Sequence, residues 1–424
     1  MSNDIEWKMV KLGDVAKFLP TNTLSRDELN YSEGEYLNIH YGDVLIKFDS
    51  VTDVLNSEIP FVSLNKKFSD KSLLKNGDIV MADTAEDESV GKVTEIQNVG
   101  NNKVVSGLHT LCMRFQENLF APKFAGYYLN SPAFHNLLLP YMHGTKVTSI
   151  SKGDVKKIIF PIPYKNGEAD LETQELIAQK LGDMDSLIAA KEKLLAKKRD
   201  LKIGAMQKLI KDEESENWKK VKLGEVIQHL RTGLNPRSNF ELNPADANGY
   251  YITVRELKGF DIITDEKTDR INANAVAKIN ERSKLKINDI LFSGTGTIGE
   301  TALVKENPDN WGIKEGIYAI TPNTKKINSR FLLYYFQTTN AILLFEEMST
   351  GSTIKSVPML KLKTLPIPIP YKNGTPDLAE QKRIASILSD MDSEISSIEN
   401  EIIKLQNLKT GMMQSYFSFN EVEE

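Results

Sequence analysis

The chain contains its own pattern twice, and this internal duplication constrains its fold more than any other feature. The seven residues Pro-Ile-Pro-Tyr-Lys-Asn-Gly occur at 161–167 and again at 368–374, a shift of 207 positions. A nine-residue motif that begins with Trp-Lys opens each half, at 7–15 and at 218–226. A repeat of this length predicts two copies of one structural unit.

A heptad pattern of apolar residues follows each copy of the proline-containing motif and predicts two long helices. Spacings of four and three residues separate its members, as in a coiled coil, where one seam faces a partner helix. At ~1.5 Å per residue, a helix of about forty residues gives a rod of ~60 Å. The predicted seam residues are Ile177, Leu181, Met184, Ile188 and Leu195 in the first copy, and Ile384, Leu388, Met391, Ile395, Ile398, Ile402 and Leu405 in the second.

The two helices carry opposite net charges, which favours pairing between them over pairing of one helix with its own copy. Residues 171–211 contain nine lysines and arginines against six acidic residues, a net charge of +3. Residues 377–424 contain four against ten, a net charge of −6. Lys191 and Lys198 interrupt the first seam, and the acidic second helix can accept them at its flanks. We therefore expect one antiparallel pair, with the globular halves at its opposite ends.

The segments outside these helices predict two globular halves of the α+β class. Short β-rich stretches such as 252–254 and 289–292 alternate with glycine and asparagine turns, and one or two short helices are expected near 331–345. The halves match in short islands, so we expect one fold that presents two different surfaces. The predicted order is a globular domain at 1–170, a helix at 171–211, a second globular domain at 212–376 and a helix at 377–424.

Length and composition indicate a soluble protein of several domains. The 424 residues are 40% hydrophobic and 26% charged, and no apolar run approaches the ~20 residues of a membrane-spanning helix. The N-terminal segment lacks the features of a signal peptide, so a cytoplasmic location is expected. Cys112 is the only cysteine, which excludes an intrachain disulfide and a cysteine-based zinc site. We expect it to be a buried structural thiol.

Motifs of catalysis and cofactor binding are weak in this sequence. Residues 294–299 fit Gly-x-Gly-x-x-Gly, but a dinucleotide site needs a helix next, and residues 300–304 are typical of a strand. A glycine-rich hairpin is therefore the favoured interpretation. Asp377 and Glu380 suit a helix start better than a nuclease site. Without ligand spacing, the five histidines are assigned ordinary surface or core roles: His40, His109, His135, His143 and His229. The sequence predicts no catalytic residue, metal site or cofactor of its own.

Polar loops at matching places in both halves have a composition suited to DNA. Arginine can hold a guanine edge through two hydrogen bonds, and hydroxyl or backbone amide groups can hold phosphates. The loops at 144–150 and 351–357 combine glycine, hydroxyl side chains and lysine. A solvated turn is the alternative for any one loop, but recurrence favours the functional interpretation. The candidate DNA-contacting residues are Thr145, Lys146, Thr148 and Lys152 in the first half, and Arg231, Thr232, Arg237, Thr295, Thr297, Ser352, Thr353 and Lys355 in the second.

Together these motifs resemble the specificity subunits of Type I restriction–modification systems over essentially the whole chain. The resemblance rests on the Trp-Lys-x-Val-Lys-Leu-Gly-[Asp/Glu]-Val openings, the glycine- and threonine-rich loops, the Ile-Pro-x-Pro segments and the helix endings at 201–206 and 408–413. It implies two pseudo-repeated target-recognition domains separated by a two-helix antiparallel coiled coil. Each domain would read one half of a bipartite double-stranded DNA sequence.

The resemblance also implies a non-catalytic subunit that docks two methyltransferase subunits on its helices. Those partners would methylate adenine at N6, and restriction subunits can join to cleave unmodified DNA in defence against phage. S-adenosylmethionine, ATP and Mg²⁺ are expected on the partner subunits alone. The acidic stretch from Asp83 to Glu88 departs from a DNA-facing composition. Either this loop faces away from DNA or partners supply much of the positive field, and we favour the second explanation.

Two other functions stay open at this point. A structural coiled-coil adaptor, whose globular ends bind proteins, would give no bipartite DNA footprint. A self-contained enzyme that uses the glycine loop would bind a nucleotide or a methyl donor without partners.

Overall fold

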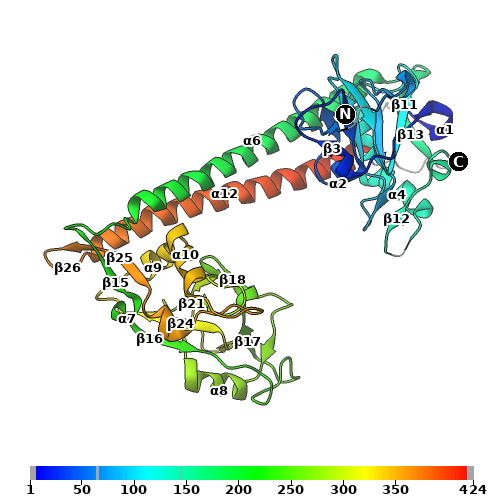
Figure 1. Cartoon of the computed structure of the whole chain (residues 1–424). Coiled ribbons are helices and arrows are strands. Elements are labelled where there is room, and N and C mark those ends of the chain that lie inside the picture. Colours follow the sequence, from blue (N-terminus) through cyan, green and yellow to red (C-terminus); the bar gives the residue numbers. More distant parts are fainter. Residues whose placement is uncertain (1–5, 64–65, 145, 418–424) are drawn as a thin grey trace. The chain divides into compact units, whose positions relative to one another are not determined.

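The computed structural model describes residues 6–63, 66–144 and 146–417 (Figure 1). Helices and strands occur in both halves of the chain, which confirms the predicted α+β class. In the part of the chain that is described, no helix is long and apolar enough to cross a membrane.

Two compact units make up the chain. Unit 1 comprises residues 1–192 and 400–424, and unit 2 comprises residues 193–399. Both long helices, α6 (Leu171–Leu209) and α12 (Leu378–Phe417), contribute one part to each unit. Each globular half is therefore packed together with helical segments from both copies of the repeat.

Unit 1 contains mixed sheets and short helices. One sheet has the order β2-β11-β7-β9-β5, formed by Ala16–Leu19, Thr110–Phe115, Ile79–Ala82, Val93–Gln97 and Val51–Asp53. Another has the order β10-β4-β6-β3, formed by Lys103–Ser106, Tyr36–Ile39, Phe61–Val62 and Leu29–Asn30. A third has the order β1-β13-β14, formed by Glu6–Lys11, Ile159–Lys165 and Glu168–Ala169. The α-helices are α1 (Leu12–Val15), α2 (Tyr41–Ile46), α3 (Phe124–Leu129), α4 (Pro132–Leu138) and α5 (Lys152–Val155).

Unit 2 repeats this plan, but its two larger sheets have fewer strands than those of unit 1. One sheet has the order β16-β24-β21-β22, formed by Ile227–Thr232, Ile317–Pro322, Ile290–Ser293 and Thr301–Leu303. Another has the order β20-β17-β23, formed by Arg270–Ile271, Gly249–Ile252 and Trp311–Ile313. A third has the order β15-β25-β26, formed by Trp218–Lys222, Pro366–Lys372 and Thr375–Pro376. The α-helices are α7 (Leu223–Val226), α8 (Ala273–Ser283), α9 (Ser329–Phe336), α10 (Thr339–Met348) and α11 (Met359–Leu362).

The central strands of the two units correspond to each other. β7 pairs antiparallel with β11 in unit 1, and β21 pairs antiparallel with β24 in unit 2. Every residue of β7 and of β21 is buried, as expected for strands covered on both faces. Each unit also has a parallel pair, β4 with β10 and β17 with β23. The duplication in the sequence is therefore a duplication of topology.

Cys112 is a buried core residue of β11, as predicted. Its exposed fraction is 1%, and burial raises the pKa of its thiol above the usual range. A thiol that stays protonated is a poor nucleophile and a poor metal ligand. Cys112 therefore behaves as a small apolar side chain.

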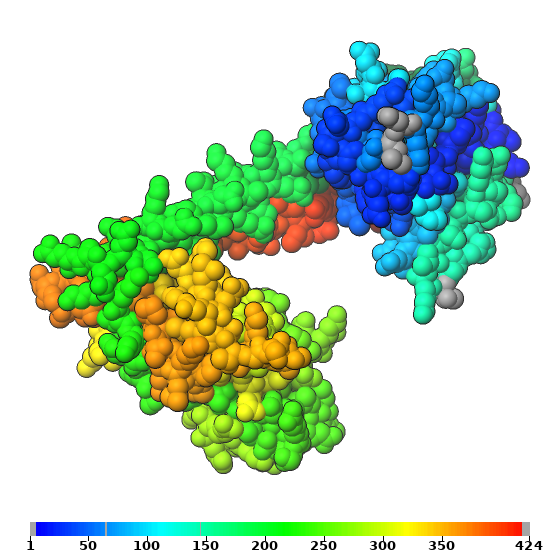
Figure 2. All heavy atoms as spheres, viewed as in Figure 1, coloured from blue at the N-terminus to red at the C-terminus, as the bar shows by residue number. Residues whose placement is uncertain are grey.

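Helices α6 and α12 run antiparallel, as predicted (Figure 1), and ion pairs link them within each unit. In unit 1, Lys191 Nζ lies 2.5 Å from Glu401 Oε2, and in unit 2, Lys198 Nζ lies 2.5 Å from Glu394 Oε1. The side chains of the two helices lie against each other in the space-filling view (Figure 2). Both lysines that interrupt the first seam are thus paired with acidic residues of the second helix.

The predicted seam residues are buried or partly buried. Burial of an apolar side chain contributes about 1.5–3 kcal/mol, whereas a partly exposed ion pair contributes about 0–1 kcal/mol. Burial of the predicted seam therefore contributes more stability than the ion pairs do. Its buried members are Ile177, Leu181, Ile384, Leu388, Ile395, Ile398 and Ile402, and its partly buried members are Met184, Ile188, Leu195, Met391 and Leu405.

Each globular core is completed by the final turns of a helix from the other repeat. In unit 1, Phe417 of α12 is fully buried, with its ring 5.7 Å from that of Phe124 and 5.1 Å from that of Tyr128. In unit 2, Met206 of α6 and Ile210, which directly follows α6, are buried in the core. Ile210 precedes Phe417 by the same 207 positions that separate the repeats.

A tyrosine, an aspartate and a lysine join the helices to each globular half in the same way. In unit 1, Tyr127 Oη donates to Asp185 Oδ2 at 2.7 Å, and Lys409 Nζ forms an ion pair with Asp185. The hydroxyl and the ammonium group share one carboxylate, which compensates their partial burial. The counterparts in unit 2, with the same contacts, are Tyr334, Asp392 and Lys202.

Candidate nucleic-acid interface

The glycine motif at 294–299 forms a hairpin between β21 and β22, as predicted. Gly296 and Gly299 have φ values of +81° and +90°, in the left-handed region that favours glycine. A Cβ on Gly294 would lie 2.2 Å from the ring of Tyr318. Backbone conformation and close packing therefore account for these three glycines.

This hairpin lies against the predicted loop at 351–357, and together they form one edge of unit 2, which we call edge 2. Gly296 N donates to Lys355 O at 2.9 Å. Thr232 joins the same edge, since its hydroxyl accepts a hydrogen bond from Gly316 N at 3.2 Å. The structure thus brings together six of the residues predicted to contact DNA: Thr232, Thr295, Thr297, Ser352, Thr353 and Lys355.

The side chains of edge 2 offer hydroxyl and cationic groups to a ligand. Five of the six residues are exposed, and Thr232 is partly buried. Arg237 is exposed in the loop after β16, where it follows Pro236, a residue that lines a cavity beside edge 2. Hydroxyl groups and cations of this kind are the usual contacts to phosphate oxygens.

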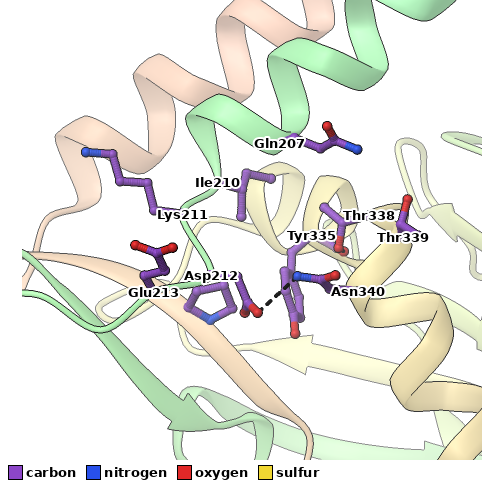
Figure 3. A pocket seen from close by; sticks show the side chains of 10 residues that line it. Gln207, Ile210, Lys211, Asp212, Glu213, Tyr335, Thr338, Thr339 and Asn340 are labelled. Carbon is purple, nitrogen blue, oxygen red and sulfur yellow. Dashed lines mark hydrogen bonds between the residues drawn. The ribbon is translucent and has the colours of Figure 1, made fainter.

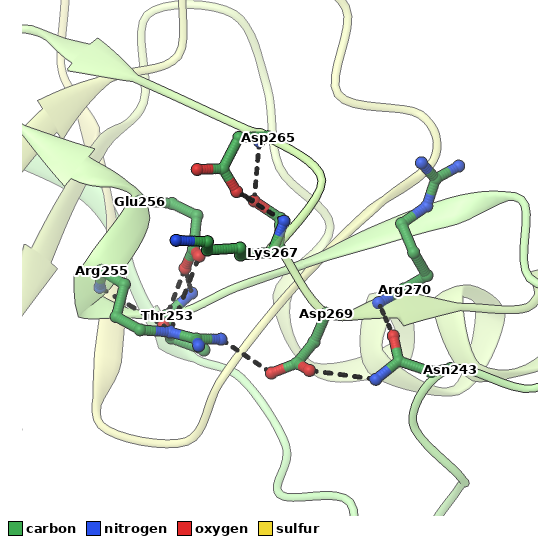
Figure 4. A network of polar contacts seen from close by, with 9 residues as sticks. Asn243, Thr253, Arg255, Glu256, Asp265, Lys267, Asp269 and Arg270 are labelled. Carbon is green, nitrogen blue, oxygen red and sulfur yellow. Dashed lines mark hydrogen bonds and ion pairs between the residues drawn. The ribbon is translucent and has the colours of Figure 1, made fainter. Parts of the chain in front are cut away.

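The cavity beside edge 2 has a volume of about 370 Å³. Two cationic side chains line it that were not among the predicted DNA-contacting residues. Arg255 belongs to the single 3₁₀ turn η4 (Val254–Glu256), and Lys314 follows β23. Arg255 Nη2 donates to Asp269 Oδ2 at 2.8 Å, and Asp269 also accepts from Asn243 Nδ2 at 3.1 Å (Figure 4). One feature of the sequence could have pointed to Arg255: it comes just after an apolar strand, at a turn that occurs in both halves.

Arg231 has an internal role instead. Its Nη2 donates to Asp289 Oδ2 at 2.8 Å and to Thr321 Oγ1 at 2.6 Å. Asp289 is 1% exposed, and burial raises the pKa of its carboxyl, although Arg231 acts against that shift. Arg114 and Asp78 form the corresponding pair in unit 1. A guanidinium that compensates a buried carboxylate is not free for DNA, so we leave Arg231 out of the proposed interface.

The residues predicted in unit 1 are more dispersed. Thr148 belongs to β12 (Thr148–Ser149), which pairs with β8 (Thr84–Ala85) in the same way as the loop and the hairpin of edge 2. Lys146 is exposed in the preceding loop. Lys152 begins α5, and its Nζ lies 5.2 Å from the ring centre of Phe18. Thr145 lies outside the described residues.

The acidic stretch begins at the corresponding edge of unit 1, which we call edge 1. Asp83 N donates to His109 O, as Gly294 N donates to Gly316 O in unit 2. The carboxylate of Asp83 lies 3.6 Å from Nδ1 of His109. The His109 ring packs edge-on against the ring of Tyr41, with the two ring centres 5.3 Å apart. Edge 1 therefore presents imidazole, phenol and carboxylate groups where edge 2 presents glycine backbone and hydroxyl groups.

His40 is a second histidine at edge 1, and it caps helix α2. Its Nδ1 accepts a hydrogen bond from Gly42 N at 3.2 Å, which requires that nitrogen to be unprotonated. Burial lowers the pKa of the His40 ring, and the charge of Arg26 acts in the same direction. Arg26 itself binds Asp43 through both terminal nitrogens, at 3.0 Å each.

A separate cavity of about 590 Å³ lies in unit 2 beside the end of α6 (Figure 3). Asp212 and Glu213 line it, and Asn340 Nδ2 donates to Asp212 Oδ2 at 3.0 Å. Carboxylates repel the phosphate backbone, so this cavity does not suit DNA. Across the ranges that the structure describes, no cluster of histidine, cysteine and acidic residues could hold a metal ion.

Comparison with known proteins gives matches in both halves. The sequence profile described as "Type I restriction modification DNA specificity domain" matches residues 4–197 and 215–407. A Methanocaldococcus jannaschii protein, provisionally named the specificity subunit of type I restriction enzyme MjaX, is 31% identical over 213 residues. That alignment covers 48% of this chain and 46% of the relative, so the match spans about half the length of that relative. The EcoBI specificity subunit of Escherichia coli is 20% identical over 449 residues, which cover 93% of this chain and 90% of that protein.

A solved structure shares the fold over nearly the whole chain. It is the S subunit of a Type-I restriction-modification system from M. genitalium, with a TM-score of 0.55 and 15% identity. The superposition covers 99% of this chain and 98% of the other. The likeness therefore includes both globular halves and both long helices.

Proposed function

We propose a function from the premise that this chain belongs to the family of Type I restriction–modification DNA specificity proteins, whose domain occurs in it twice. The chain is the sequence-recognition subunit of such a system. Unit 1 and unit 2 each read one half of a bipartite DNA site. Helices α6 and α12 set the distance between the half-sites and dock two methyltransferase subunits, which methylate adenine at N6. Restriction subunits join the same complex to cleave unmodified DNA.

One observation carries this proposal: the topology is duplicated, but the corresponding edges bear different side chains. His109 and Asp83 of edge 1 take the places of Gly316 and Gly294 of edge 2. Base edges are told apart by the hydrogen-bonding groups that a protein presents to them. A repeated scaffold with two different edges therefore supports recognition of two different half-sites.

The two alternative functions have less support. An adaptor without DNA binding fits poorly with two matches to a DNA specificity domain. A self-contained enzyme would need the glycine motif to precede a helix, but β22 follows it. We therefore assign recognition and assembly to this chain, and we assign S-adenosylmethionine, ATP, Mg²⁺ and the chemical steps to its partners.

Exposed leucines of α6 support the docking of partner subunits. Leu187, Leu194 and Leu201 are spaced seven residues apart, which places them on one face of the helix. Their exposed fractions are 44%, 37% and 50%. An exposed apolar row on a protein surface is typical of an interaction site. On α12, the positions that correspond to Leu187 and Leu194 are Glu394 and Glu401, and only the third is again an exposed leucine, Leu408, so the full row occurs on α6.

A genome-wide map of N6-methyladenine, with and without the gene, tests the proposal. Deletion should remove methylation from one bipartite motif, and a tagged copy of the chain should copurify a methyltransferase subunit. Unchanged methylation, together with a pull-down that contains no methyltransferase, would contradict the proposal.

A further inference from the structure

We propose that Arg255 reads a guanine in the half-site bound by unit 2. This inference rests on the proposed function and adds to it one residue and one base. Arg255 lines the cavity beside edge 2 together with Thr295 and Lys314. It therefore lies where the structure gathers the residues that were predicted to contact DNA.

The guanidinium of Arg255 is held in a defined orientation before any ligand binds. Its Nη2 donates to Asp269, and its Nε lies 3.4 Å from Thr253 Oγ1 (Figure 4). Asp269 is fixed in turn by Asn243, whose Oδ1 accepts from Arg270 N at 2.7 Å. A side chain that is already ordered loses less conformational entropy on binding, which favours a specific contact.

The same guanidinium still has donors available. Within the described ranges, Nη1 of Arg255 makes no hydrogen bond or ion pair, and the side chain is 57% exposed. Guanine presents two acceptors, O6 and N7, on its major-groove edge, and the planar fork of arginine matches both. Nη1 and the second N–H group of Nη2 are the two donors that this contact requires.

The charges around the cavity are compatible with a DNA ligand. Asp269 is paired with Arg255, and Glu315 Oε2 accepts from Asn235 Nδ2 at 2.6 Å. Lys314 is exposed, and none of the acidic residues described in the structure forms an ion pair with it. Lysine acts as a point charge toward phosphate. Lys314 therefore offers a phosphate contact next to the base contact of Arg255.

The corresponding place in unit 1 explains why this contact belongs to one half-site. Gly42 stands two residues after the cap of its helix, as Arg255 does. Arg26 approaches from another segment, and a Cβ on Gly42 would lie 3.4 Å from its Nη2. Both terminal nitrogens of Arg26 are bound to Asp43, however, so its fork is already occupied.

The test uses the full chain with its partner subunits in a host that lacks the native gene. Wild type, Arg255→Ala, Arg255→Lys and the control Arg282→Ala are compared by mapping N6-methyladenine. Arg282 is an exposed arginine of α8 and does not line the cavity. Both Arg255 variants should relax the preference for one G·C pair in one half-site by roughly 10-fold to 100-fold. The other half-site and the Arg282→Ala motif should be unchanged.

The Arg255→Lys variant distinguishes a contact to the guanine edge from a contact that needs only positive charge. Lysine keeps the positive charge but lacks the fork, so it should not restore the preference for guanine. If Arg255→Lys kept the full preference for guanine, the proposal would be overturned in favour of a phosphate contact. An unchanged motif in Arg255→Ala would overturn it as well. Failure of the proposed function looks different, because wild type would then methylate no bipartite motif.

A binding assay covers the case in which Arg255→Ala abolishes methylation. The assembled complex is titrated with the methylated duplex and with duplexes that carry one substituted base pair each. The proposal requires the variant to lose discrimination at one position while wild type retains it. An equal loss of affinity for every duplex would contradict the proposal. The variant Asp269→Asn, which weakens the orienting contact but keeps Arg255, should fall between wild type and Arg255→Ala.

Discussion

Edge 1 and edge 2 occupy the same place in two copies of one topology, yet their chemistry differs. At edge 1, His109 and Asp83 lie side by side, and His40 caps the neighbouring helix. At edge 2, glycine turns lie beside Arg255 and a row of hydroxyl groups. The comparison shows that the scaffold does not dictate the chemistry of its edge. Two recognition surfaces can therefore diverge on one fold.

The junctions between helices and globular halves show the opposite behaviour. The unit built from Tyr127, Asp185 and Lys409 recurs in unit 2 with the same residue types and the same contacts. In each case the lysine comes from the helix of the other repeat. These junctions hold each unit together, so a change there acts on folding, whereas a change at an edge acts on the ligand.

The largest expected effect is on the cores that the helix ends complete. Phe417→Ala should destabilise unit 1 by about 3–5 kcal/mol, because it leaves a cavity among Phe124 and Tyr128. Ile210→Ala should destabilise unit 2 by about 2–5 kcal/mol for the same reason. Denaturant unfolding of both variants measures these losses and assigns each transition to its unit.

Leu360→Ala is the control for both core variants, since this side chain on α11 is 79% exposed. Its unfolding free energy should stay within about 0.5 kcal/mol of wild type. If Phe417→Ala were equally mild, the end of α12 would not belong to the core of unit 1.

A smaller effect is expected at the junctions. Asp392→Ala leaves the hydroxyl of Tyr334 and the ammonium of Lys202 without their shared acceptor, which should cost unit 2 about 1–3 kcal/mol. Asp185→Ala should cost unit 1 a similar amount. Urea denaturation of the two variants, with the exposed Asp390→Ala as control, gives the comparison. A difference of more than about 1 kcal/mol between the two junctions would show that the units are not held together equivalently.

The helices could be predicted from the sequence because their determinants are local. The heptad spacing predicted the two long helices, and the net charges of the two segments predicted the antiparallel mixed pair. The glycine hairpin followed from the strand-like residues after it. The role of Phe417 could not be predicted in this way, since its partners Phe124 and Tyr128 lie 293 and 289 residues away in sequence.

The candidate site could be predicted only in part, because tertiary partners decide what an arginine does. Arg231 and Arg255 both follow strand-like segments and look equally available in sequence. Arg231 meets the buried carboxylate of Asp289, 58 residues further on. Arg255 meets Asp269 at the surface and keeps its fork open. Short loop motifs singled out Thr295 and Lys355, which lie at one edge in the structure, but no local pattern distinguishes the two arginines.

The response to acid should distinguish the edges. Burial lowers the pKa of His40 in the folded protein, and the charges of Arg26 and His109 act in the same direction, while Asp43 opposes them. The unfolded chain, with a histidine pKa of about 6.5, then binds the proton more readily. The stability contributed by neutral His40 is therefore present above that pH and is lost as the pH falls toward the folded pKa. Thr253, the corresponding cap in unit 2, does not titrate.

His40→Asn keeps a capping oxygen but removes the titrating group. Between pH 7 and pH 5, the variant should lose less unfolding free energy than wild type, and the transition of unit 2 should respond equally in both proteins. Thermal unfolding at a series of pH values measures this difference. Parallel pH profiles for wild type and His40→Asn would remove His40 from the explanation.

The smallest expected effect concerns the charge difference between the long helices. Lys198→Glu places two carboxylates together, since Lys198 pairs with Glu394, and it should cost unit 2 about 0.3–1 kcal/mol. Combining it with Glu394→Lys should restore most of that loss, and a double-mutant cycle measures the coupling. Absence of recovery would mean that the pair contributes no coupling. This small energy still affects which helices associate. In a pair formed by two copies of α6, Leu194 would take the place of Glu401, and Lys191 would lose its acidic partner. The charges therefore act on the choice of partner more than on stability.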